Sequence, residues 1–368
     1  LGRPSRRPVG GREPPDLQDM SAATPTLVPV EACPLCGAEA GEALLAAVGG
    51  LGVVRCGACR LVRATGQYSA QFLSEDFYAG RAERAPASAP VRPGAARKRR
   101  NLALYDRLSR GQIGRPRPGA RALDIGCNTG LLLDVLRERG YHTEGIERSP
   151  AGEVALAAGH VVHALDIEAH ELGLPRYDLI TMTHVLEHLR RPTAGLVWVR
   201  RHLVPGGVAV VEVPNWGDRM RPLWGRSYRP LELGDHVSFF ERETLHAAAE
   251  RAGLTVLQMW SAPQAGTLVV PSLLTALDLG LGLRAALRGP KPVAAPGDLP
   301  AAEAAAGGVA GPRVVSGNLA GGLRRALTPV VLAALDGLDP ALERVFGPDC
   351  PWGANLVAVL TAARNPGA

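Results

Sequence analysis

Leu123-Asp124-Ile125-Gly126-Cys127-Asn128-Thr129-Gly130 is the stretch that decides the fold of this chain. A short apolar run leads here into an acid and a Gly-x-x-x-Gly loop, and residues 131–139 then repeat apolar positions at helical spacing. Glycines permit backbone angles and close approaches that a Cβ would block, and a helix N-terminus directs its amide groups at a ligand. The stretch therefore predicts a strand, a loop and a helix of an α/β fold that binds a nucleotide-like cofactor.

The spacing of the glycines separates two cofactor classes that use such a loop. The dinucleotide fingerprint G-x-G-x-x-G requires glycine at positions 126, 128 and 131, but Asn128 and Leu131 occupy the last two. The G-x-G-x-G pattern of class I S-adenosylmethionine-dependent methyltransferases fails only at Asn128, and the chain resembles that family. The resemblance implies cofactor contacts from the acid and the loop, namely Asp124, Gly126, Asn128 and Gly130.

The resemblance extends over five ordered matches between residues 121 and 213. The second strand ends in Glu147, about twenty residues after Gly126, where the family's carboxylate accepts both ribose hydroxyls of the cofactor. In the family, an acidic side chain in the turn after the third strand contacts the adenine amino group, and the resemblance implies this role for Asp166. Residues 177–189 resemble the fourth strand and the helix that line the cofactor, which adds Thr183 to the expected cofactor contacts.

The family fold is a Rossmann-like domain of seven strands, of which the last is antiparallel. We expect the sixth strand at 255–260 and the last at 355–362. Between them lies a helical and flexible insert at about 264–352, too long for an ordinary loop. Its leucine-rich stretch 268–287 is interrupted by charged residues and glycines, which argues against a membrane span. The remaining interpretations are a helix that covers the core, a homodimer contact and an interfacial helix.

Two C-x-x-C pairs stand upstream of the glycine loop, Cys33 with Cys36 and Cys56 with Cys59. Their spacing matches a tetrahedral Zn²⁺ site, and four protein ligands leave no position open for catalysis, so the metal is expected to be structural. A disulfide pair and a redox C-x-x-C are the alternatives. No apolar signal segment precedes the cysteines, which favours zinc and a cytoplasmic location.

Composition predicts the organisation of the remaining chain. We expect a disordered segment at 1–29, with translation starting at Met20, and a zinc-binding module at 30–80. A basic linker and lead-in helix follow at 81–118, and the methyltransferase domain occupies 119–368. Residues 81–117 hold eleven basic and two acidic residues, so their net charge of +9 exceeds the +6 of the whole chain. The linker is interpreted as a solvated helix face, with a patch for a phosphorylated substrate or RNA as the alternative.

Two histidines are candidates for the base that a hydroxyl or activated-carbon acceptor requires. His236 lies in a loop beyond the fifth strand, on the expected acceptor side, and is the first choice. His184 follows the fourth strand and is expected nearer the methionine end of the cofactor. Pocket lining by His184 and a structural hydrogen bond from His236 are the alternative roles.

The resemblance favours O-methylation of a small molecule, in particular a hydroxyl of a sugar, a nucleotide-linked sugar or another product of secondary metabolism. Zinc modules accompany sugar methyltransferases in the resembling family, but this chain lacks the length for the further C-terminal domain of the sugar C-methyltransferases. C-methylation is therefore the second choice. An RNA or protein methyltransferase and a non-catalytic cofactor-binding protein remain as alternatives. A nucleic-acid partner is disfavoured because aromatic residues make up only 4% of the chain.

Overall fold

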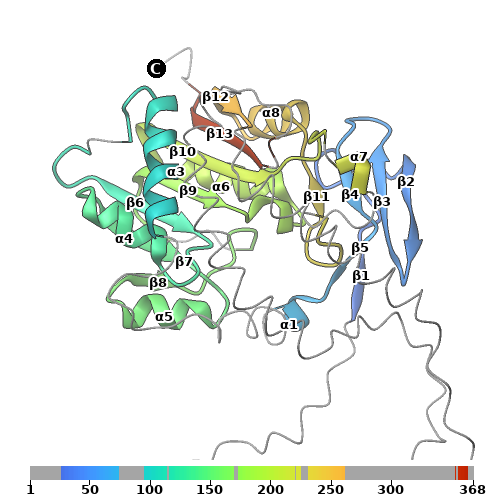
Figure 1. Cartoon of the computed structure of the whole chain (residues 1–368), viewed down its shortest axis with the longest axis horizontal. Coiled ribbons are helices and arrows are strands. Elements are labelled where there is room, and N and C mark those ends of the chain that lie inside the picture. Colours follow the sequence, from blue (N-terminus) through green and yellow to red (C-terminus); the bar gives the residue numbers. More distant parts are fainter. Residues whose placement is uncertain are drawn as a thin grey trace, which may run out of the picture.

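The computed structural model describes residues 26–73, 95–113, 116–169, 173–219, 221–224, 231–261, 353 and 355–363. The expected insert at 264–352 and the segment 1–25 lie outside the described residues. Figure 1 shows the described part as a large α/β unit with a smaller β unit (blue) at one side.

A seven-stranded mixed sheet forms the centre of the large unit, in the order β12-β13-β10-β9-β6-β7-β8. Its members are β6 (Arg121–Ile125), β7 (His142–Ile146), β8 (Val161–His163), β9 (Tyr177–Thr183), β10 (Leu203–Pro214), β12 (Leu254–Trp260) and β13 (Asn355–Ala362). β13 runs antiparallel to both β10 and β12, whereas the pairs among β6, β7, β8, β9 and β10 are parallel. The predicted seven-stranded fold with an antiparallel last strand is confirmed.

Helices cover both faces of this sheet. The described helices of the large unit are α3 (Ala95–Leu108), α4 (Leu131–Glu138), α5 (Ala151–Ala157), α6 (Pro192–His202), α8 (Arg242–Arg251) and the 3₁₀ turn η2 (Leu186–His188). The short helix α7 (Arg221–Trp224) lies beside the smaller β unit (Figure 1). Side chains alternate along β10, so that Val211 packs in one core cluster with α6 and α8, and Val210 packs in the other with α3 and α4. Among the described helices, none combines the length and apolarity that crossing a bilayer requires.

The N-terminal module contains two small sheets. β1 (Leu27–Pro29) pairs with β5 (Gly66–Tyr68), and β5 leads into the short helix α1 (Ala70–Phe72). The second sheet has the order β11-β4-β3-β2, from β2 (Gly41–Val48), β3 (Leu51–Cys56), β4 (Val62–Ala64) and β11 (Ser238–Phe239). Two expected boundaries therefore differ from the structure. β1 lies at the end of the segment 1–29, where it pairs with β5, and the module takes its last strand, β11, from a segment far along the chain.

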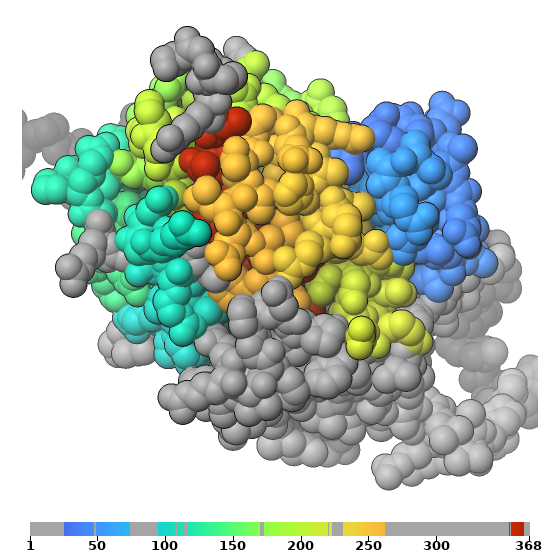
Figure 2. Space-filling model, turned by 90° about the horizontal axis from the view of Figure 1, so that it is seen from above, coloured from blue at the N-terminus to red at the C-terminus, as the bar shows by residue number. Residues whose placement is uncertain are grey.

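The module is joined to the large unit by polar and apolar contacts. Arg55 donates two hydrogen bonds of 3.0 Å to the carboxylate of Glu241, and Arg251 donates to the carbonyl of Leu35 at 2.8 Å. Leu35 and Leu61 belong to the same core cluster as one face of the central sheet. Figure 2 shows the orange segment with α8 and β12 beside the blue module, as these contacts require. The module thus forms one side of the large unit.

Candidate active site

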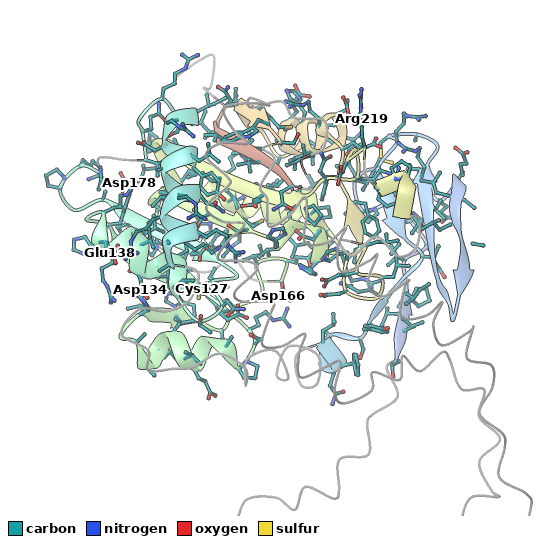
Figure 3. The ribbon with its side chains drawn as sticks, in the orientation of Figure 1. Cys127, Asp134, Glu138, Asp166, Asp178 and Arg219 are labelled. Atoms are coloured by element: carbon teal, nitrogen blue, oxygen red, sulfur yellow. The ribbon has the colours of Figure 1, made fainter. Side chains whose placement is uncertain are left out.

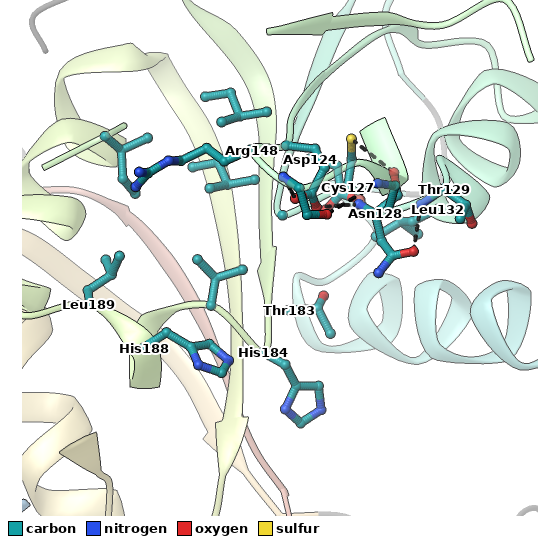
Figure 4. A pocket seen from close by; sticks show the side chains of 18 of the residues that line it. Asp124, Cys127, Asn128, Thr129, Leu132, Arg148, Thr183, His184, His188 and Leu189 are labelled. Atoms are coloured by element: carbon teal, nitrogen blue, oxygen red, sulfur yellow. Dashed lines mark hydrogen bonds between the residues drawn. The ribbon is translucent and has the colours of Figure 1, made fainter. Parts of the chain in front are cut away.

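A cavity of about 750 Å³ opens at the carboxyl ends of the parallel strands. Segments after β6, β7, β8 and β9 line it, together with the loop that precedes β11 (Figure 4). This edge is where open α/β sheets bind ligands. The lining includes six of the seven expected cofactor residues, namely Asp124, Gly126, Asn128, Glu147, Asp166 and Thr183, and both candidate bases, His184 and His236.

The glycine loop owes its shape to three residues with positive φ angles. Gly126 has φ 74°, and a Cβ there would lie 2.4 Å from Cγ2 of Val185. Gly130, which is the N-cap of α4, has φ 80°, and a Cβ there would lie 2.7 Å from Cδ2 of His160. Asn128 has φ 49°, a left-handed conformation that asparagine tolerates better than most residues. The departure from the glycine pattern at position 128 therefore preserves the turn.

Glu147 holds the loop through its carboxylate at the end of β7. Its Oε2 accepts from the backbone N–H of Asn128 at 2.9 Å, and its Oε1 accepts from the N–H of Ser149 at 2.8 Å. Farther along the edge, Oδ2 of Asp166 accepts from Arg148 at 2.9 Å, and Figure 3 shows Asp166 on the same side of the ribbon as Cys127 of the loop. The proposed contacts of Glu147 with ribose and of Asp166 with adenine stay predictions.

Asp124 lies beneath the loop as a buried carboxyl group. Thr181 on β9 donates to its Oδ1 at 2.7 Å, and burial raises the pKa of Asp124 to about 6. Thr183 ends β9 two residues farther on and borders the cavity. These side chains place polar atoms under the part of the cavity where the glycine loop exposes its backbone.

His184 is fixed among carboxylates immediately after β9. Its backbone has φ 56°, and its Nδ1 lies 3.2 Å from Oε1 of Glu187. Its Nε2 lies 3.3 Å from the side-chain nitrogen of Asn355 and 3.7 Å from Oε1 of Glu212. Desolvation lowers the pKa of His184, but the hydrogen bond to Glu187 and its charge raise that pKa more. The net upward shift favours a charged imidazole at this position.

His236 faces a second histidine, His188, that the sequence reasoning did not select. Their ring centroids are 4.7 Å apart in an edge-to-face arrangement, and Nδ1 of His188 lies 3.0 Å from Oδ1 of Asp235. Burial lowers the pKa of His188, but the Asp235 hydrogen bond and the charge of Glu187 raise it to about 9. The pair Glu187-His188, which begins four residues after the end of β9, is the sequence signal that could have identified this group.

The surroundings of His236 favour the neutral imidazole. Its side chain is largely buried, and burial is the main reason why its pKa lies below the ordinary value, while the charge of His188 acts in the same direction. A neutral imidazole at the wall of a cofactor-sized cavity can accept a proton from a bound hydroxyl.

The four predicted cysteine ligands lie together in the N-terminal module. Sγ of Cys33 is 3.5 Å from Sγ of Cys59, and Sγ of Cys36 is 3.5 Å from Sγ of Cys56. All four sulfurs lie within 4.8 Å of one another. Four thiolates around one tetrahedral Zn²⁺ are separated by about 3.8 Å, which this cluster matches and a disulfide of about 2 Å does not. The donor set therefore fits zinc.

The ligand atoms of Glu187, His188 and His236 form a second group within 4.8 Å of one another. The Oε2 atom of Glu187 and Nδ1 of His236 are buried without a hydrogen-bond partner among the described residues. Two imidazoles and one carboxylate are also a donor set that divalent transition metals accept. The group can therefore serve either proton transfer or metal binding.

Residues 94–259 match the family described as methyltransferase domain. A ubiquinone biosynthesis O-methyltransferase from Aeromonas salmonicida is 30% identical over 161 residues, which cover 38% of this chain and 65% of the relative. The same enzyme from Pseudomonas aeruginosa is 28% identical over 155 residues, or 38% of this chain and 66% of the relative. The chain thus spans slightly less than two thirds of the length of these curated relatives.

Two solved structures show how the chain compares with distant proteins. An amino pentose methyltransferase from Micromonospora echinaspora aligns with a TM-score of 0.35 and 20% identity, over 50% of this chain and 90% of that one. A methyltransferase from Streptomyces caelestis aligns with a TM-score of 0.41 and 14% identity, over 78% and 96%. The family match at 94–259 falls on the central sheet, whose seven strands with an antiparallel last strand form the α/β methyltransferase fold.

Proposed function

We propose that this chain transfers the methyl group of S-adenosylmethionine to a hydroxyl of a small molecule. The methyltransferase domain match and the O-methyltransferase names of the relatives support the reaction class. The observation that carries the proposal is the pairing of a buried, neutral imidazole, His236, with the charged His188 on the wall of the cavity.

The residues at the carboxyl edge divide the cavity into two functional parts. Glu147, Asp166 and the glycine loop would hold the adenosine of the cofactor, since they offer carboxylates and backbone N–H groups. The cofactor supplies an electrophilic methyl group on a sulfonium when it is bound. The three histidines border the remaining part of the cavity, which leaves this part for the acceptor.

His236 would accept the hydroxyl proton of the acceptor. A protonated His236 would then be stabilised by the charges of Glu187 and Glu232, both of which raise its pKa. His184 is the runner-up for this role, because its contacts with Glu187 and Asn355 hold it in place and favour its charged form. The acceptor part of the cavity contains carboxylate and imidazole groups that suit a polyhydroxylated molecule.

A sugar or natural-product hydroxyl of secondary metabolism is the substrate class that we propose, with C-methylation of a nucleotide-linked sugar as the second choice. The four free thiols of the module fit one structural zinc ion and a reducing compartment, and we propose the cytoplasm. We also keep the division into a zinc module at 30–80, a basic linker at 81–118 and a methyltransferase domain at 119–368, with β11 shared between units.

Metal-assisted deprotonation of the acceptor is the second candidate for the mechanism. It is favoured by the 4.8 Å group of Glu187, His188 and His236 and by the unpartnered Oε2 of Glu187. A divalent cation held there would lower the pKa of a bound hydroxyl.

The test is methyl transfer from labelled S-adenosylmethionine to a panel of sugar, amino-sugar and catechol acceptors. His236→Ala should lower kcat about 100-fold, with the affinity for S-adenosylmethionine changed less than about threefold. His246→Ala is the matched control, because His246 is an exposed histidine on α8 with a partner in Glu250. Near-normal turnover by His236→Ala would refute the assignment.

A chelator arm separates the two mechanisms. The protein is dialysed against EDTA and its zinc content is measured in parallel, so that loss from the cysteine cluster is recognised. Full activity with the cysteine-bound zinc retained would support His236 as the base. Loss of activity that Mn²⁺ restores would support the cation at Glu187, His188 and His236.

A further inference from the structure

Gln67 of the N-terminal module reaches into the wall of the candidate active site. Its side-chain nitrogen donates to the backbone carbonyl of His188 at 2.9 Å and to that of Asp235 at 3.2 Å. The residue lies on β5 and is only 6% exposed. One amide group therefore links the turn η2, which carries His188, to the loop that carries Asp235 and His236.

Backbone hydrogen bonds join the same three segments. Tyr68 N–H donates to the carbonyl of Gly234 at 2.7 Å, and Ala64 N–H donates to that of Val237 at 2.9 Å. Val237 N–H in turn donates to the carbonyl of Glu187 at 2.8 Å. The loop 234–237 thus lies between the module and η2, and it is hydrogen-bonded to both.

Gly234 permits this close approach. It has φ 92°, and a Cβ at this position would lie 2.4 Å from Cε2 of Tyr68. Both the backbone angle and the contact exclude an ordinary side chain. The loop is therefore shaped to receive β5 of the module.

We infer that Gln67 is a positioning residue for the acceptor site, so that the zinc module completes the wall on which His188 and His236 stand. This inference rests on the proposed function. Gln67 ties the backbone of His188 to the backbone of Asp235, and the side chains of these two residues are 3.0 Å apart. Separation of η2 from the loop would lengthen that contact and move His236 relative to His188.

The cysteine cluster is connected to this link through the backbone of the module. Arg63 on β4 donates to the carbonyls of Val30 and Glu31, which lie three and two residues before Cys33. Val30 N–H donates to the carbonyl of Thr65 at 3.0 Å, two residues before Gln67. These hydrogen bonds connect the cysteine-bearing segment to β4 and to the residues that precede Gln67 on β5.

A movement of η2 away from the loop would change the pKa of His188, because charged side chains from both segments surround its ring. Glu187, Asp235 and His236 face its ring from η2 and from the loop, with Nε2 of His188 3.9 Å from Oε1 of Glu187. A longer contact with Asp235 removes a hydrogen bond that favours the charged ring, so the pKa of His188 should fall. This readout does not depend on knowledge of the acceptor.

Gln67→Met tests the inference, because it keeps roughly the length of the side chain, removes its N–H donors and adds no charge near His188. NMR titration of the His188 ring gives its pKa, and we expect a decrease of about one unit in the variant, which corresponds to a tenfold change in the proton equilibrium. We also expect kcat to fall at least about tenfold, with the affinity for S-adenosylmethionine changed less than about threefold.

Arg55→Ala is the control for a purely structural effect. Arg55 docks the module through Glu241, away from the cavity, so its loss should lower the melting temperature and leave the pKa of His188 unchanged. An unchanged His188 pKa in Gln67→Met, or the same decrease in both variants, would overturn the inference. If the His188 pKa falls only in Gln67→Met but wild-type protein methylates no acceptor, the proposed function fails and the positioning role stands.

Discussion

Replacing Glu147 by alanine is the perturbation that examines the cofactor assignment most closely. The carboxylate accepts hydrogen bonds of 2.9 Å from the Asn128 N–H and 2.8 Å from the Ser149 N–H. Each oxygen can accept a further hydrogen bond, and Glu147 borders the cavity, so ribose hydroxyls are the proposed donors. The substitution therefore removes the proposed ribose acceptor and loosens the glycine loop.

The magnitude follows from the number of charged hydrogen bonds that are lost. A hydrogen bond to a charged group contributes about 1.5 to 3 kcal/mol, and two ribose hydroxyls would lose this acceptor. Water that enters the space beside an alanine offsets part of the loss, because the site borders an open cavity. We expect a net cost of about 2 kcal/mol, or about a 30-fold weaker affinity for S-adenosylmethionine.

Calorimetric titration with S-adenosylmethionine measures this cost. Glu153→Ala is the matched control, because Glu153 is an exposed acid in the first turn of α5. Glu147→Gln should bind about as weakly as the alanine variant, since its amide N–H group must face the N–H of either Asn128 or Ser149. An affinity within a factor of two of wild type for both Glu147 variants would refute the ribose assignment.

Three further predictions concern the metal, the loop and the pH profile. Metal analysis should find one zinc per chain, and Cys36→Ser should lose it and lower the melting temperature; a folded, reduced protein without zinc would contradict the site. Gly126→Ala should reduce cofactor affinity by at least about tenfold, because its Cβ would lie 2.4 Å from Cγ2 of Val185. Unchanged affinity would show that the loop accommodates the Cβ and would contradict the prediction. Activity should rise with pH as His236, whose pKa lies below 6.5, loses its proton, and it should fall above about pH 9 as His188 loses its proton. His188→Gln should remove this alkaline decrease. If the decrease persists in the variant, a group other than His188 causes it.

Strands such as β6 and β13 could be predicted because their apolar runs are short, bounded and buried on both faces. The expected strand at 355–362 coincides with β13, and the strand at 121–125 coincides with β6. Glycine-driven turns mark these boundaries, so local sequence was sufficient. Asn128 differs from the consensus glycine at its position, but its left-handed backbone conformation fulfils the same role. Comparison of residue types with the consensus pattern alone does not show this equivalence.

The contacts between the module and the site could not be predicted from local sequence. β11 is only two residues long, Ser238–Phe239, and it gains its strand character by pairing with β4, which lies more than a hundred residues earlier. Gln67 shows no pattern of its own, and its role follows from two carbonyls in separate segments. His188 was missed because its significance depends on Asp235 and His236, which only the fold brings beside it.

Binding of the cofactor to the purified chain tests the central claim most directly. Titration with S-adenosylmethionine and, separately, with NAD compares the two cofactor classes that the glycine loop distinguishes. The account predicts one S-adenosylmethionine per chain, displaced by S-adenosylhomocysteine, with NAD binding much more weakly. Tighter binding of NAD, or no saturable binding of S-adenosylmethionine by a folded protein with its zinc in place, would contradict it.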